Sequence, residues 1–232
     1  TRPIAKWMDI PLLEPSTPQE AKDMTKYAFD ISEEFKVLCM LRSVTHLSHT
    51  RGNVRLDKLP DKPIQQAYFP DIYDKFKPTK SKFTAGPSPE PHNTLHLKLA
   101  KVAQEFESSI FNSYVGPEKS ELLIVTSGIC WLYCLEAVER LALGERVGIL
   151  KLGTIWPLPE KLIEKYLTKS QKVLVVEEID PFLERSLKEL AGELGLKLTF
   201  YGKKSRHLKD YGEQDPDTII RVLADIMGVV YK

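Results

Sequence analysis

The chain has 232 residues, 42% of them hydrophobic, and its 33 basic and 32 acidic residues give a formal net charge of +1 at pH 7. The apolar content is ordinary for a soluble globular protein, and so balanced a charge argues against nucleic acid or an anionic membrane as a partner. No apolar run approaches the roughly 20 residues of a membrane-spanning helix, and no basic-then-apolar leader opens the chain, so we expect a cytoplasmic protein.

The cysteines indicate a reducing compartment. Cys39, Cys130 and Cys134 form no Cys-x-x-Cys pair, and any pairing scheme leaves one of them over. They offer no spacing for a zinc site or an iron–sulfur cluster, and we predict no metal ligands. Because Cys130 and Cys134 lie four residues apart on one face of a predicted helix, we expect both to be small core residues.

The first predicted elements are a short strand at 10–13, a helix at 17–35 and a second strand at 37–41. Both strands are continuous apolar runs, which suits burial on both faces. Thr17 can cap the helix, and Glu20 completes a Thr-x-x-Glu capping box.

A polar cluster follows the second strand. Residues 42–52 hold two histidines, two arginines and several hydroxyl groups. Because ligands gather at the carboxyl ends of parallel strands, this cluster is a candidate functional site. The alternative is a polar loop whose His49 and Arg51 bind neighbouring backbone or a partner chain. His46 and His49 are three residues apart, without the helical or zinc-like context that would indicate a metal.

The composition changes at 59–91, where prolines punctuate a polar, lysine-rich run. That pattern indicates an extended connection between two domains, because so long a stretch without regular structure is unusual inside one. A helix at 94–113 follows, with Ile110 on its buried stripe. His92 and His96 at its start are more typical of a solvated helix end than of a ligand pair.

The rest of the chain alternates strands and helices. Each continuous apolar run is followed by a segment with helical periodicity. Such alternation, with crossovers long enough to return the chain to the same edge, predicts an α/β fold with an open parallel sheet. The predicted strands lie at 122–125, 147–152, 172–176 and 196–201, and the predicted helices at 129–141, 159–167, 181–194 and 217–227.

Two features of this half are candidates for chemistry. Ser127 and Gly128 set backbone N–H groups at a helix N-terminus, where an anion can bind, although neither a Gly-x-Gly-x-x-Gly nor a Walker motif is present. Glu177 and Glu178 end the third strand of this half, and paired carboxylates can serve acid–base chemistry. Because no histidine, lysine or metal pattern accompanies them, we expect one to meet solvent and the other a structural partner.

Four separated segments resemble the alpha subunit of indolepyruvate ferredoxin oxidoreductase, within the 2-oxoacid:ferredoxin oxidoreductase group. They are 14–29 (EPSTPQEAKDMTKYAF), 41–52 (LRSVTHLSHTRG), 150–153 with 157–160 (LKLG and PLPE), and 173–184 (VLVVEEIDPFLE). The resemblance covers most of the chain from Thr1 to about Gly202. Ser48 and His49 match a Ser-His pair that recurs in the wider group, which makes them candidates for cofactor binding.

The resemblance implies a domain organisation and an activity. Residues 1–57 would be the C-terminal part of a pyrimidine-binding α/β domain, 58–119 a proline-rich connector and helix, and 120–232 a transketolase C-terminal-like, or swivel, domain with a terminal helix. The implied enzyme uses thiamine diphosphate, magnesium and [4Fe–4S] clusters to convert arylpyruvates to aryl-acetyl-coenzyme A with ferredoxin as electron acceptor. The implied partners are the remaining domains of the alpha subunit, a smaller beta subunit and ferredoxin.

Departures from the family limit what this chain is expected to do alone. The family's catalytic acid, the first half of its pyrimidine domain, its diphosphate-binding domain and its cysteine-rich domain have no counterpart in the sequence. We therefore expect a middle segment, inactive by itself, that supplies no catalytic residue and holds neither thiamine diphosphate nor a cluster. The start at Thr1, in mid-pattern, favours a segment. Two alternatives stay open: a free-standing structural or assembly subunit, and a flavodoxin-like module that binds its ligand at the turn of residues 126–128.

Overall fold

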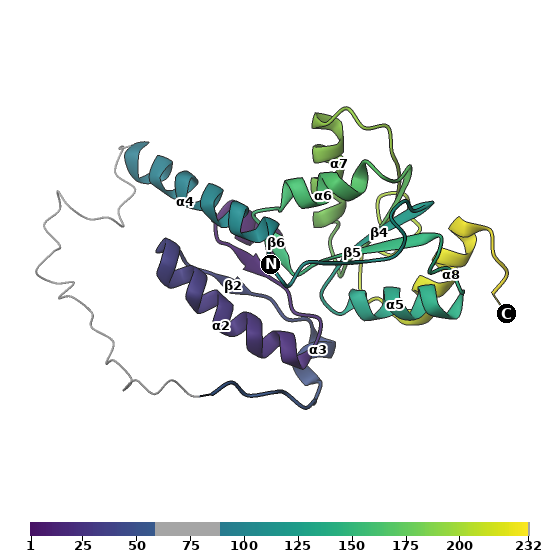
Figure 1. The fold of residues 1–232 in the computed structure, drawn as a ribbon, viewed down its shortest axis with the longest axis horizontal. Helices are drawn as coiled ribbons and strands as arrows, with labels where there is room; N and C mark the ends of the chain where they lie inside the picture. Colours follow the sequence, from purple (N-terminus) through teal and green to yellow (C-terminus); the bar gives the residue numbers. More distant parts are fainter. Residues whose placement is uncertain (59–88, 232) are drawn as a thin grey trace, which may run out of the picture.

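A computed structural model describes residues 1–58 and 89–231, and Figure 1 shows two parts side by side, one carrying α2 and α4 and the other the larger sheet. The predicted connection at 59–91 lies outside the described residues, except for its last three, which begin helix α4. Within the described ranges, no helix combines the length and the apolar character needed to cross a bilayer.

The N-terminal elements are α1 (Arg2–Trp7), β1 (Leu12–Leu13), α2 (Pro18–Phe35), β2 (Met40–Leu41), α3 (Thr45–His49) and α4 (Pro89–Glu107). Helix α2 begins where its predicted cap places it. The Thr17 hydroxyl accepts a hydrogen bond from the Glu20 N–H at 3.1 Å, and the Glu20 carboxylate accepts one from the Ser16 N–H at 2.8 Å. Helices α2 and α4 share a small apolar core that includes Met24 and Phe106.

The C-terminal elements are β3 (Ser113–Val115), β4 (Leu122–Ser127), α5 (Cys130–Arg140), β5 (Val147–Leu152), β6 (Thr154–Trp156), α6 (Glu160–Leu167), β7 (Lys172–Val176), α7 (Phe182–Glu193), β8 (Thr199–Tyr201) and α8 (Pro216–Met227). Five strands form the large sheet, in the order β3-β5-β4-β7-β8. All are parallel to their neighbours except β3, which pairs antiparallel with β5. The predicted α/β fold with a parallel sheet is confirmed.

Helices cover both faces of the large sheet (Figure 1). One face packs against α5 and α8, and the other against α6 and α7. Alternate residues of a strand point to opposite faces, so Ile124 lies in the first layer and Leu123 and Val125 in the second. The connection from β4 to β5 runs toward one edge of the sheet, and the connection from β5 to β7 returns across β4 toward the other edge. Because crossovers between parallel strands are right-handed, the helices of these two connections, α5 and α6, lie on opposite faces.

The small sheet, in the order β2-β1-β6, attaches the N-terminal part to the large sheet. Only Gly153 separates β5 from β6, so the chain passes directly from one sheet into the other. A Cβ at Gly153 would lie 2.6 Å from the Met24 side chain and 2.6 Å from the Phe111 carbonyl oxygen, which leaves no room for another residue type. Asn112 fixes the crossing, since its Oδ1 accepts bonds from the N–H groups of Gly153 and Thr154 at 2.9 and 3.1 Å.

The sequence pattern misses α1, β3 and β6 and extends one helix too far. The helix predicted at 94–113 ends at Glu107, and Ile110, predicted on its buried stripe, is 88% exposed. Ser113 pairs instead with Lys151 of β5. Sheet pairing at a free edge satisfies the backbone N–H and C=O groups of this segment, and it overrides the helical period.

Other predictions are shortened or confirmed. The strands predicted at 10–13, 37–41 and 196–201 shorten to β1, β2 and β8, and part of the polar run after β2 forms the short helix α3. Cys130 and Cys134 are fully buried on α5, which confirms them as core residues.

Candidate functional site

The usual ligand site of an open α/β sheet is the crevice at the carboxyl ends of two strands from which the chain leaves in opposite directions. In the large sheet this point lies between β4 and β7, since β5 is on one side of β4 and β7 on the other. Ser127 ends β4, and Glu177 and Glu178 follow β7. This crevice is therefore the candidate functional site.

The guanidinium of Arg2, on α1, fills the crevice. It donates two hydrogen bonds to Glu14, at 2.6 and 2.7 Å, and one to Glu177 Oε2 at 2.8 Å. It also donates to Ser127 Oγ at 2.9 Å and to the Glu178 carbonyl oxygen at 3.1 Å. Arg2 is 3% exposed. The Arg2 cluster, as we call it, comprises Arg2, Glu14, Arg42, Ser127 and Glu177.

Both carboxylates of the Arg2 cluster have further donors. Glu14 accepts a bond from Arg42 at 2.9 Å. Glu177 accepts bonds from the backbone N–H groups of residues 182–184, at 2.9 to 3.1 Å, where α7 begins. Such N–H groups lack partners within the helix and favour a negative charge. Each buried carboxylate is thus paired and hydrogen-bonded, as a buried charge requires.

The pKa values of the Glu14 and Glu177 carboxyl groups are shifted in opposite directions by burial and pairing. Burial alone would raise the pKa of Glu14, but the guanidinium groups of Arg2 and Arg42 outweigh it and hold that pKa below its ordinary value. Burial raises the pKa of Glu177 above its ordinary value, although Arg2 and the N–H groups of α7 act against it. Glu14 is therefore the firmly ionised partner of Arg2.

The structure corrects the prediction that one of the paired glutamates meets solvent. Glu177 is fully buried and Glu178 is 4% exposed. The Glu178 Oε1 atom accepts a bond from the Gln214 N–H at 3.2 Å and lies 3.7 Å from the Cys130 sulfur. Burial, together with this carboxylate, raises the pKa of the Cys130 thiol well above its ordinary value. The thiol is therefore a poor nucleophile in the folded protein.

The predicted anion site at the end of β4 lies beneath Glu14. Ser127 accepts its bond from Arg2, and Gly128 has a φ of +56°, a conformation that favours glycine. A Cβ at Gly128 would lie 3.6 Å from Glu14 Oε2, so this carboxylate covers the turn. An anion bound there would meet a buried negative charge, which argues against the flavodoxin-like alternative.

The other candidates lie at the surface, on α3 and just after it. Ser48, His49 and Arg51 are exposed, and Ser48 Oγ shares a 2.8 Å hydrogen bond with Ser43 Oγ. Helix α3 docks on α5 through His46, whose Nδ1 lies 2.8 Å from the hydroxyl of Tyr133. Across residues 1–58 and 89–231, no hydrogen bond links Ser48, His49 or Arg51 to the Arg2 cluster.

A cavity of about 40 Å³ remains beside the Arg2 cluster, lined in part by Arg2, Arg42 and Asp180. It has room for water but not for a coenzyme, because small-molecule sites usually enclose about 300–1,000 Å³. Ile179 borders the cavity with a φ of +60°, which is strained for a β-branched residue. Arg2 holds this turn through its bond to the carbonyl oxygen of the preceding Glu178.

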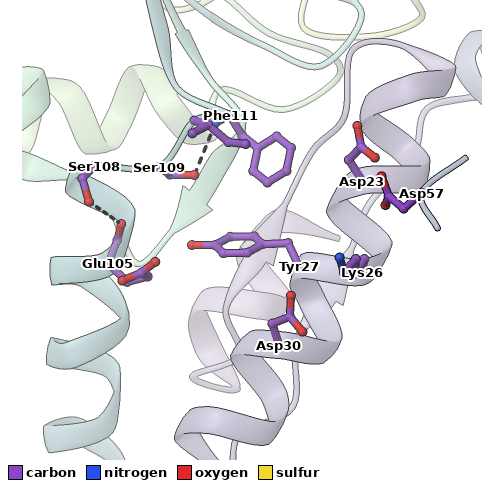
Figure 2. A pocket seen from close by; sticks show the side chains of 10 residues that line it. Asp23, Lys26, Tyr27, Asp30, Asp57, Glu105, Ser108, Ser109 and Phe111 are labelled. Atoms are coloured by element: carbon purple, nitrogen blue, oxygen red, sulfur yellow. Dashed lines mark hydrogen bonds between the residues drawn. The ribbon is translucent and has the colours of Figure 1, made fainter. Parts of the chain in front are cut away.

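A larger cleft of about 350 Å³ opens between α2 and the end of α4 (Figure 2). Tyr27 projects into it, with its ring centroid 5.3 Å from that of Phe111, and burial raises the pKa of Tyr27 to about 12. The rim of the cleft carries one basic residue, Lys26, and the carboxylates of Asp23, Asp30, Asp57 and Glu105. Such an acidic rim favours cations over anions.

Thiamine diphosphate, the cofactor that the resemblance implies, does not fit the described residues by themselves. Arg2 fills the crevice between β4 and β7, and the carboxylates around the larger cleft would repel a diphosphate. Ser48, His49 and Arg51 lie on an open surface. A site for this cofactor would need groups from beyond the residues that the structure describes.

Sequence reasoning missed Arg2 and Glu14, and it included Arg42 only as one of the two arginines of the candidate cluster at 42–52. Arg2 is 12 residues from Glu14 and 175 residues from Glu177, so no local spacing marks the cluster. The available signal was Glu14 itself, a carboxylate directly after an apolar strand. Such a group needs a cationic partner if it is buried.

The known proteins that match this chain include oxidoreductase subunits. Residues 120–197 match the family model of pyruvate:ferredoxin oxidoreductase core domain II. The chain is 39% identical over 205 residues to indolepyruvate oxidoreductase subunit IorA of Thermococcus kodakarensis, a match that covers 88% of this chain and 31% of that protein. It is 32% identical over 232 residues to IorA of Methanothermobacter thermautotrophicus, covering 98% and 36%. The chain thus spans about a third of the length of these curated relatives.

Solved structures show the same fold. The 2-oxoglutarate:ferredoxin oxidoreductase of Magnetococcus marinus, solved with 2-oxoglutarate, coenzyme A and succinyl-CoA, matches with a TM-score of 0.60 at 17% identity, over 93% of this chain and 42% of that one. A split-gene transketolase, an inactive beta4 tetramer, matches with a TM-score of 0.51 at 14% identity, over 95% and 58%. The resemblance predicted from the sequence is confirmed: the chain is homologous over most of its length to indolepyruvate oxidoreductase subunit IorA, of which it spans about a third, and its residues 120–197 match core domain II of pyruvate:ferredoxin oxidoreductases.

Proposed function

We propose that this chain is a segment of a thiamine diphosphate-dependent oxidoreductase that acts on arylpyruvates such as indolepyruvate. In this reaction the 2-oxoacid loses carbon dioxide, its acyl group passes to coenzyme A, and two electrons pass to ferredoxin. The observation that carries the proposal is the 39% identity to subunit IorA over 205 residues, which leaves little of this chain unmatched.

The proposal assigns a place to each part of the chain. Residues 1–57 complete a pyrimidine-binding domain, 58–119 form a connector and helix, and 120–232 form a swivel domain. The core domain II match at 120–197 supports the last assignment. Thiamine diphosphate, magnesium and the [4Fe–4S] clusters belong to the rest of the protein. The partners are a smaller beta subunit and ferredoxin, in the cytoplasm.

The role proposed for this segment is structural. The charged groups in its crevice bind one another, and the cavity beside them, about 40 Å³, has no room for a substrate. The segment would therefore position the catalytic parts without supplying a catalytic residue, and it would be inactive alone. A free-standing structural subunit, the alternative, would have the same role but no catalytic parts on its own polypeptide.

Ferredoxin reduction by the native protein tests the proposed activity. With coenzyme A present, indolepyruvate should reduce ferredoxin faster than 2-oxoglutarate or pyruvate does, and the 232-residue chain alone should be inactive. A preference for 2-oxoglutarate would contradict the substrate assignment. The intact mass of the native polypeptide separates the two structural roles. A mass near 26.5 kDa would support the free-standing subunit, and a much larger mass would support the segment.

A further inference from the structure

We propose that Asp9, His92 and His96 form a binding site for one late first-row transition-metal ion, with Zn²⁺ as the representative. Asp9 lies in the turn after α1, and the two histidines lie on the first turns of α4. Their ligand atoms are all within 4.8 Å of one another. The site is apart from the Arg2 cluster and does not depend on the proposed oxidoreductase activity.

The geometry leaves room for an ion between the three side chains. His92 and His96 share one face of α4, since residues four apart on a helix are neighbours, and their ring centroids are 4.2 Å apart. The distance to Asp9 Oδ2 is 3.7 Å from His96 Nε2 and 3.9 Å from His92 Nε2, too long for hydrogen bonds. Ligands about 2.0–2.2 Å from a tetrahedral zinc ion lie about 3.3–3.5 Å apart, so small side-chain rotations complete the site.

Both sides of the site are held in place by the fold. Asp9 adopts a φ of +53°, which aspartate tolerates better than most residues, and its N–H lies 3.3 Å from the Lys6 carbonyl oxygen. Helix α4 is anchored further along by the buried side chains of Leu99 and Val102. Binding an ion would therefore order few groups that are not ordered already.

The donor set selects the class of metal. Two imidazoles and one carboxylate suit Zn²⁺, Ni²⁺ or Cu²⁺, whereas Mg²⁺ and Ca²⁺ prefer ligand sets made of oxygen alone. The His92 and His96 side chains are 68% and 57% exposed, so water can occupy the remaining coordination positions. A bound ion would tie α4 to the turn after α1, two segments that are far apart in the chain.

Zn²⁺ binding by the full protein, measured by equilibrium dialysis, tests the site. The wild type should bind one equivalent more than His92→Gln or His96→Gln at a zinc concentration that saturates the wild-type site. Loss of a group that only orients a ligand already weakens metal binding by about 10–100-fold, so loss of a ligand should weaken it at least as much. His49→Gln, which removes an exposed imidazole on α3, is the matched control and should bind as the wild type does.

Thermal unfolding supplies a readout that does not depend on activity. Because an ion that binds the folded state stabilises it, Zn²⁺ should raise the unfolding temperature of the wild type and of His49→Gln. The increase should be smaller in His92→Gln, His96→Gln and Asp9→Asn, and excess Mg²⁺ should not displace the zinc. Equal zinc binding by the wild type and both α4 variants would overturn the proposal, and so would an equal loss in His49→Gln.

Discussion

The two sheets of this protein are held by different forces. The strands of the large sheet are buried between apolar layers on both faces, and hydrophobic burial stabilises them. The small sheet has strands of two or three residues. Leu12 and Ile155 bury apolar side chains in the layer that includes α6 and α7, and the Arg2 cluster and the crossing at Gly153 add buried polar contacts. Truncating a side chain in an apolar layer lowers stability in proportion to the apolar volume removed. Removing one partner of a buried ion cluster lowers it more sharply, because the other partner is left buried with an uncompensated charge.

The largest effect is expected for Arg2→Ala. The substitution leaves Glu14 and Glu177 buried with less compensating charge, and it should lower the free energy of unfolding by about 3–5 kcal/mol in urea titrations. Arg146→Ala is the matched control. Arg146 pairs with Glu121 at 2.7 Å, but both side chains are well exposed. Such exposed surface pairs contribute little to stability, so equal losses in the two variants would contradict the account.

Asn112→Ala should weaken the crossing between the sheets less severely. It leaves the N–H groups of Gly153 and Thr154 without their side-chain acceptor. Unsatisfied buried donors cost about 1–3 kcal/mol, which the same urea titrations would detect. Asn112→Asp keeps an acceptor at that position and should recover part of the loss. An unchanged unfolding midpoint in Asn112→Ala would show that the crossing does not depend on this side chain.

Acid should weaken the attachment of the N-terminal part to the large sheet by protonating Glu14. Burial opposes its ionisation, but Arg2 and Arg42 hold its pKa below the ordinary value. Its stabilisation is therefore present above the ordinary carboxyl pKa and is lost as the pH falls through the lowered pKa. The pKa of Glu177 is raised by burial, so the stability linked to Glu177 is present at low pH and is lost as the pH rises through that pKa.

Unfolding measured between about pH 3 and pH 7 separates the two glutamates, each of which changes stability by at most about 1.4 kcal/mol per pH unit. Glu14→Gln should flatten the loss of stability toward acid. Glu177→Gln should flatten the opposing change toward neutral pH. The same pH profile in both variants would mean that the two carboxylates are not shifted in opposite directions.

The smallest effects are expected at two helix caps, one in each part of the molecule. Thr17 caps α2, and Asp215 caps α8 by accepting a bond from the Thr218 N–H at 2.8 Å. Thr17→Ala and Asp215→Ala should each lower the free energy of unfolding by about 1 kcal/mol. Thr17→Ser and Asp215→Asn retain a capping oxygen and serve as controls. A loss well above that of Asn112→Ala would reverse the expected order of effects.

The sequence predicts the large sheet well and the contacts between the two sheets poorly, for a physical reason. Continuous apolar runs such as 122–125 and 173–176 predict buried strands from local composition alone, and the Thr17 cap lies within one turn of the helix that it starts. Arg2 binds partners 12 and 175 residues away, and β6 of the small sheet begins only one glycine after β5 of the large sheet ends. Such contacts depend on how distant segments pack, which local patterns do not record. The surface candidates Ser48, His49 and Arg51 stay predictions.

Residue-specific thiol labelling of Arg2→Ala tests the central claim, that the Arg2 cluster holds the N-terminal part on the large sheet. Burial raises the pKa of Cys39, next to β2, and of Cys134, on α5, to about 12, so both thiols should react slowly in the folded protein. Mass spectrometry after alkylation should show faster labelling of Cys39 in Arg2→Ala, with Cys134 still protected and Arg146→Ala unchanged. Equal acceleration at both cysteines, or none at Cys39, would contradict the claim.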